Sequence, residues 1–162
     1  MTITAALVKE LRERTGAGMM DCKKALVETN ADLEAAIDLM RASGAAKAAK
    51  KAGRVASEGL VNVVISDDNK SAVILEVNSE TDFVTKGQSF IDFVSALGKL
   101  ALKNKPESIE AFLALTLDSG ETVDEAREGI IAQIGENVSV RRLQNVSAKN
   151  GVLGAYKHGD RI

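Results

Sequence analysis

The side chains that most often carry catalysis or bind metals are scarce in this 162-residue sequence. It contains one histidine (His158), one cysteine (Cys22) and one tyrosine, too few for a Cys/His metal cluster. It also lacks a phosphate-binding loop, a dinucleotide fingerprint and a nucleophile elbow. Carboxylates are plentiful, and paired-acid chemistry stays open because a sequence alone does not place two carboxylates together. We therefore expect no catalytic residue, no metal site and no cofactor.

Residues 78–84 combine an aromatic side chain with a predicted change from strand to helix. Thr81 is a good N-cap residue, which places Asp82 and Phe83 in the first helical turn, where a carboxylate is favoured. A Phe in that turn can point outward, and aromatics are only 3% of the chain, so Phe83 is a candidate wedge for a partner's pocket. The alternative is that Phe83 packs beneath the sheet. Residue type alone favours burial, because Phe is among the residues most often buried.

The composition is typical of a soluble globular protein, with 45% hydrophobic residues, 27% charged residues and a net charge of −2. Residues 1–57 carry 10 basic and 7 acidic side chains, whereas residues 58–162 carry 11 and 16. This asymmetry favours a protein partner over a phosphate backbone. A single cysteine fits a reducing compartment, and we expect a cytoplasmic protein with no signal peptide, membrane anchor or membrane partner.

Three short amphipathic helices are predicted in residues 1–43, and they must share one small core. The first follows the N-cap Thr4, the second begins near Asp21, and the third is capped by Asp32 and stops before Gly44. Met19 and Met20 lie in the turn before the second helix. They are either core filler or an adaptable contact patch, since methionine is used for both.

Residues 44–57 are rich in Ala, Lys and Gly and predict a connector helix. Its basic residues recur at helical spacing and form one predicted stripe: Lys47, Lys50, Lys51 and Arg54. A solvated face is the favoured interpretation, because the stripe has no interleaved aromatics. Docking on an acidic protein surface and RNA binding are the alternatives.

Residues 58–150 predict a second, α+β domain in which helices cover one face of a small antiparallel sheet. Two β-branched runs, 58–65 and 71–77, flank a polar turn and predict a hairpin. Helical spacing then continues to residue 101 with a break at Gly87, and Pro106 starts another helical segment. A capping box at residues 122–125 opens a helix that Gly135 can end, and a strand follows at 138–146.

Residues 151–162 resemble the start of the first hairpin and predict the beginning of an incomplete second subdomain. No returning strand follows the turn at residues 158–160, so either the chain is truncated or this strand pairs with another copy. We expect self-association through this strand, or disorder. His158, in a turn among small and polar residues, is expected to be a surface contact.

Several motifs resemble those of the bacterial elongation factor Ts family and cover nearly the whole chain in the family's order. They are the runs Leu7–Leu26 and Lys47–Ala52, the junction Glu76–Val84, and Ile134–Asn137 with Arg141 and Arg142. The resemblance implies a ubiquitin-associated-like three-helix module followed by the family core. It also implies a guanine-nucleotide exchange factor, without bond-making chemistry, for elongation factor Tu in its GDP-bound and nucleotide-free forms.

The resemblance also implies residue roles. Arg12, Met19 and Met20 would bind a helix of the GTPase. This role favours the interpretation of the methionines as a contact patch over their interpretation as core filler. Asp82 and Phe83 would lie near the GTPase magnesium site, and the segment Thr81, Asp82, Phe83 and Val84 would displace Mg²⁺. Ile134 and Gly135 would lie near the phosphate-binding loop, and His158 would contact a more distal domain.

Family members normally continue into a second core subdomain, a helical hairpin and a C-terminal element, which this sequence lacks. No nucleic-acid partner is expected, because the charge of the whole chain does not point to one. A protein-interaction module without exchange activity and an RNA-binding protein that uses the basic stripe remain the alternatives.

Overall fold

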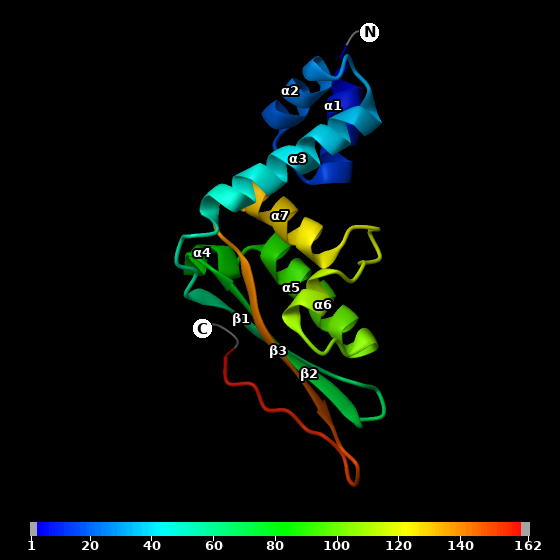
Figure 1. Cartoon of the computed structure of the whole chain (residues 1–162), viewed down its shortest axis with the longest axis vertical. Coiled ribbons are helices and arrows are strands. Elements are labelled where there is room, and N and C mark those ends of the chain that lie inside the picture. The colour runs from blue at the N-terminus through cyan, green and yellow to red at the C-terminus, as the bar shows by residue number, and fades with distance from the viewer. Residues whose placement is uncertain (1–2, 160–162) are drawn as a thin grey trace. The chain divides into compact units, whose positions relative to one another are not determined.

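The computed structural model describes residues 3–159, which fall into two compact units. Unit 1 contains the residues through Gly53 together with Glu128–Glu136. Unit 2 contains Arg54–Arg127 and the residues from Asn137 onward. Figure 1 shows the elements of each unit along the chain.

The N-terminal part of unit 1 is built from three helices: α1 (Ala5–Thr15), α2 (Met19–Glu28) and α3 (Leu33–Lys51). The predicted caps are confirmed, because Leu7 N–H donates to Thr4 Oγ1 (3.2 Å) and Ala35 N–H donates to Asp32 Oδ1 (3.0 Å). One apolar face of each helix meets the others in a single core, as the sequence predicted. The core consists of Val8, Leu11, Cys22, Ala25, Leu26, Ala36 and Ile37.

Two helix boundaries in unit 1 differ from the prediction. The helix α2 begins at Met19, directly after its N-cap Gly18, and not near Asp21. The expected end of the third helix before Gly44 is wrong, because α3 continues through Gly44 to Lys51. The Ala/Lys-rich stretch is a strong helix former and extends α3. The predicted boundaries at residues 43, 57 and 150 stay predictions.

The basic stripe that the sequence predicted is only partly helical. Lys47, Lys50 and Lys51 lie on α3, but Arg54 follows its end. Lys47 pairs with Asp21 at 3.7 Å, so one of the three helical lysines already has an acidic neighbour within unit 1.

Unit 2 contains a three-stranded antiparallel sheet in the order β1-β2-β3. The strands are β1 (Glu58–Ile65), β2 (Ser71–Ser79) and β3 (Ser139–Ser147). The predicted hairpin is confirmed, with Glu58 opposite Ser79 and Ile65 opposite Ala72. In its turn, the Ser66 hydroxyl and the Lys70 N–H donate to Asp68, and these bonds lower the pKa of its carboxyl group.

Four helices follow the hairpin: α4 (Asp82–Thr85), α5 (Gln88–Asn104), α6 (Ile109–Leu113) and α7 (Val123–Ile134). The helix α5 covers one face of the sheet, as Figure 1 shows, and Asn62 Nδ2 of β1 donates to Val94 O of α5 (3.2 Å). The largest side chains of this core, Phe90 and Phe112, are fully buried. These features confirm the predicted α+β fold. The helix α7 begins in unit 2 and ends in unit 1.

Two buried polar side chains lie near the C-terminal end of β2. Glu76 and Asn78 are buried there, and Asn78 Nδ2 donates to Glu76 Oε1 (3.2 Å) and to Glu58 O (3.2 Å). Arg142 Nε donates to Glu76 Oε2, and Arg141 lies 3.8 Å from the other carboxylate oxygen. A buried carboxylate is tolerated when it is paired and hydrogen-bonded, so this cluster fixes the end of β2.

The segment after β3 contains no strand among its described residues, 148–159. Its start is hydrogen-bonded to the hairpin turn, since Ala148 N–H donates to Lys70 O (2.9 Å) and Leu153 N–H donates to Asn69 O (2.8 Å). The predicted self-association of this segment stays a prediction, and residues 160–162 of it lie outside the described residues. Across residues 3–159, the structure contains no helix with the length and apolar character needed to cross a bilayer.

Candidate functional site

The junction between β2 and α4 is held in place by short-range polar contacts. Thr81 is the N-cap of α4, with an extended backbone (φ −127°, ψ 156°), as the sequence predicted. The Thr85 hydroxyl donates to Asp82 O (2.7 Å), and Lys86 Nζ donates to Asp82 Oδ2 (2.8 Å). These bonds close a single helical turn. Val84 is half-buried within it.

Phe83 is 81% exposed, so the burial that its residue type favours is wrong. The reason is its place in the turn: Thr85, two residues later, faces the core and is buried. Positions two apart lie on roughly opposite sides of a helix, which turns Phe83 outward. The Lys86 side chain lies beside it, with Nζ 5.7 Å from the ring centroid. The turn therefore displays a large apolar side chain on the surface.

Glu80, directly before this turn, makes contacts with distant parts of unit 2. Its Oε1 accepts a hydrogen bond from the Asn137 backbone N–H (2.7 Å) and lies 3.6 Å from Arg54 Nη1. Asn137 Nδ2 in turn donates to Arg54 O (2.8 Å). No role for Glu80 was predicted from the sequence. Its position inside the 76–84 motif was the available signal.

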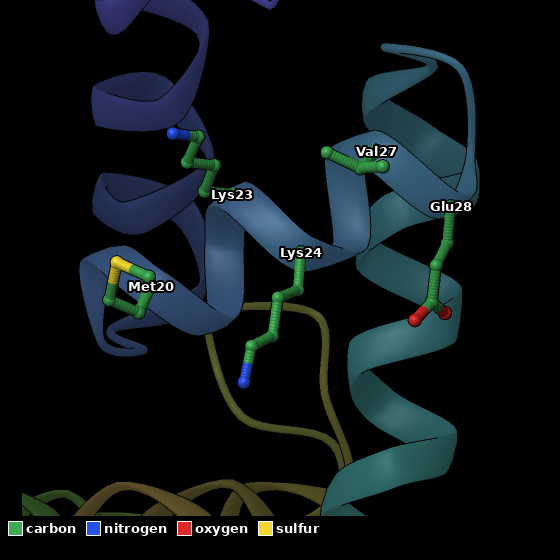
Figure 2. Close-up of a pocket in the computed structure, with 5 residues that line it drawn as sticks. All are labelled: Met20, Lys23, Lys24, Val27 and Glu28. Atoms are coloured by element: carbon green, nitrogen blue, oxygen red, sulfur yellow. The ribbon is translucent and has the colours of Figure 1, made fainter.

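A second exposed apolar surface lies on α2. Met19, Met20 and Val27 are 60%, 66% and 56% exposed, whereas Cys22, Ala25 and Leu26 of the same helix belong to the core. An open depression of about 260 Å³ is lined entirely by this helix. Figure 2 shows its lining residues, Met20, Lys23, Lys24, Val27 and Glu28. The methionines are therefore not core filler, and Val27, seven residues after Met20, could have been found from its helical spacing.

The remaining predicted site residues lie on several elements. Arg12 is exposed on α1. Ile134 is the half-buried last residue of α7, and Gly135 follows with a left-handed backbone (φ 78°) and an N–H that donates to Ile131 O (2.9 Å). Gly135 therefore ends the helix, as predicted. His158 is exposed, and its Nδ1 lies 3.1 Å from the Tyr156 hydroxyl.

The candidate site residues are divided between the two units. Unit 1 contains Arg12, Met19, Met20, Ile134 and Gly135, and unit 2 contains the Thr81–Val84 turn and His158. Within residues 3–159, no group of three or more His, Cys, Asp and Glu side chains could hold a metal ion. Exposed apolar side chains beside charged ones are suited to binding another protein.

Comparisons with known proteins point to one family. The family model described as Elongation factor TS matches residues 80–162. Relatives named Elongation factor Ts include those of Ruthia magnifica subsp. Calyptogena magnifica, 67% identical over 162 residues, and Thioalkalivibrio sulfidiphilus, 56% identical over 163 residues. Each alignment covers 100% of this chain and 55% of the relative, so the chain spans about half the length of these curated relatives. The matched model covers more than half of the chain, and the chain belongs to the elongation factor Ts family.

Proposed function

We propose that this chain is a guanine-nucleotide exchange factor that binds elongation factor Tu and promotes release of GDP during translation elongation. The observation that carries the proposal is the exposed Phe83 in the turn that follows Thr81. This turn belongs to the part of the chain that the family model matches. A large apolar side chain held on the surface by a closed turn is suited to enter a pocket of a partner.

We assign each set of candidate residues a different role in the complex with the GTPase. The α2 surface with Met19 and Met20, together with Arg12, binds a helix of the GTPase and supplies affinity. The turn with Asp82 and Phe83 acts near the magnesium site. Ile134 and Gly135 act near the phosphate-binding loop, and His158 contacts a more distal domain.

Exchange requires no bond to be made or broken, so it requires no catalytic side chain. It requires that the factor bind the nucleotide-free GTPase more tightly than the GDP form. Because binding linkage is reciprocal, the same free-energy difference then weakens GDP. Disturbing Mg²⁺ and the phosphate loop removes charge contacts that hold the nucleotide, and burial of Phe83 offsets part of that cost.

Release of a fluorescent GDP analogue from bacterial elongation factor Tu tests this proposal. The labelled complex is mixed with excess unlabelled GDP and increasing amounts of the 162-residue chain, and the release rate is followed. We expect the rate to rise with the concentration of the chain. A variant with Glu107→Ala, an exposed residue between α5 and α6, is the matched control and should behave as the unmodified chain.

Direct binding measured in parallel separates exchange from simple association. If the chain binds elongation factor Tu but leaves the release rate unchanged, it acts as a protein-interaction module and the exchange proposal is wrong. If neither binding nor release is observed, this half-length chain does not support the activity.

A further inference from the structure

The contacts of Glu80 connect three segments of unit 2. Its carboxylate accepts a hydrogen bond from Asn137 N–H at 2.7 Å and lies 3.6 Å from Arg54 Nη1. The Asn137 side chain closes the triangle by donating to Arg54 O at 2.8 Å. The side chain of Glu80 is only 22% exposed and Asn137 is 7% exposed. Hydrogen bonds to a charged group are stronger than neutral ones, and partial burial reduces competition from water.

Arg54, Glu80 and Asn137 each lie at a junction between segments of the chain. Arg54 and Asn137 are the residues at which the chain enters unit 2, after Gly53 and after Glu136. Glu80 lies between the last residue of β2 and the first turn of α4, three residues before Phe83. One carboxylate therefore joins both entry points to the segment that displays Phe83.

We infer that Glu80 is a positioning residue for Phe83, an inference that rests on the proposed function. The helix α4 has four residues, and a helix of one turn does not hold itself in water. The bonds of Thr85 and Lys86 to Asp82 act only within the turn. The bonds of Glu80 attach the turn to segments 26 and 57 residues away in sequence, so they reduce the freedom that Phe83 would lose on binding.

The inference predicts a specific kinetic signature. Glu80→Ala removes both the acceptor for Asn137 and the ion pair with Arg54. Loss of charged hydrogen bonds should raise the concentration of chain needed for half-maximal GDP release about tenfold. The maximal release rate should change little, because Phe83 itself remains. Glu80→Gln keeps an acceptor for the Asn137 N–H and should restore part of the loss.

A double-variant comparison tests whether Glu80 acts through Phe83. In a chain that already carries Phe83→Ala, Glu80→Ala should have little further effect on binding to elongation factor Tu. Glu107→Ala serves as the control for loss of an exposed carboxylate. If the effects of Glu80→Ala and Phe83→Ala multiply as independent changes, the positioning role is wrong.

Backbone amide exchange of the isolated chain provides a readout that needs no partner. Glu80→Ala should accelerate exchange at the amides of Asn137, Lys86 and Gly87, the last two of which donate to Phe83 O and Val84 O, while amides of the central strand β2 keep their protection. Unchanged protection at these positions would overturn the inference. If the unmodified chain releases no GDP, the proposed function fails, and the amide measurement still decides whether Glu80 holds the turn.

Discussion

Replacement of Phe83 by alanine should separate nucleotide exchange from folding stability. The side chain is 81% exposed, so its truncation removes little apolar surface from the protein's own core. Its contact with the Lys86 ammonium, 5.7 Å from the ring centroid, is an exposed cation–π interaction. We therefore expect the free energy of unfolding to fall by no more than about 1 kcal/mol.

The effect on exchange should be much larger. Full burial of a Phe side chain in a partner's pocket contributes about 1.5–3 kcal/mol. Since each 1.4 kcal/mol corresponds to a factor of ten, the efficiency of GDP release should fall about 10- to 100-fold. Release of a fluorescent GDP analogue and urea unfolding of the same preparations measure the two quantities.

Phe90→Ala is the matched control, because Phe90 lies on the next helix and is fully buried. This variant should lose about 3–5 kcal/mol of stability, the usual cost of truncating a core Phe. The reasoning is refuted if Phe83→Ala loses comparable stability, or if it releases GDP as fast as the unmodified chain at an equal folded fraction.

The fold itself supports further predictions. Gly59→Ala would place a methyl group 2.2 Å from a carbonyl oxygen of β2, so urea unfolding should show a loss of at least about 1–3 kcal/mol. Gly129→Ala, in the interior of α7 with no neighbouring atom within 4 Å, should instead gain about 0.5–1 kcal/mol, and a loss would contradict the open space around it. Thr122→Ala removes half of a capping box and should cost about 1 kcal/mol in the same assay, whereas Thr122→Ser should cost much less. Removal of residues 1–53 should accelerate amide exchange at residues 128–136, which cluster with them, and unchanged protection there would show that the cluster does not stabilise α7.

Most helices and strands could be predicted because their signals act over a few residues. Caps, hairpin turns and alternation of apolar residues are local, and the capping box that opens α7 is confirmed by both of its hydrogen bonds. The end of α3 could not be predicted in this way. Glycine normally weakens a helix by about 1 kcal/mol, but here Gly44 is buried where a Cβ would lie 3.8 Å from the Ala132 Cβ and 3.7 Å from Glu128 O. These neighbours are more than 80 residues away in sequence and leave no local signal.

The candidate site was predictable in part. Adjacent residues cannot both face inward on a helix, so the sequence could show that one of the two methionines is exposed. It could not show this for Met19, which lies three residues before the buried Cys22. For Phe83, average burial favoured the wrong environment, because the orientation of a single helical turn decides its exposure and Thr85 faces the core instead. The role of Glu80 depends on contacts with residues 54 and 137, which only the folded chain brings together.

The packing of α3 against the end of α7 has a consequence for the order of folding during synthesis. Unit 1 is complete only when residues 128–136 have been made, although its first three helices emerge much earlier. The 74 residues from Arg54 to Arg127 separate the two parts. At about 5–20 residues per second, a ribosome needs about 4–15 s to translate them. During that interval the surface of α3 around Gly44 is without Glu128 and Ala132, so a nascent chain arrested before residue 128 should be cleaved more readily within α3 than a finished one.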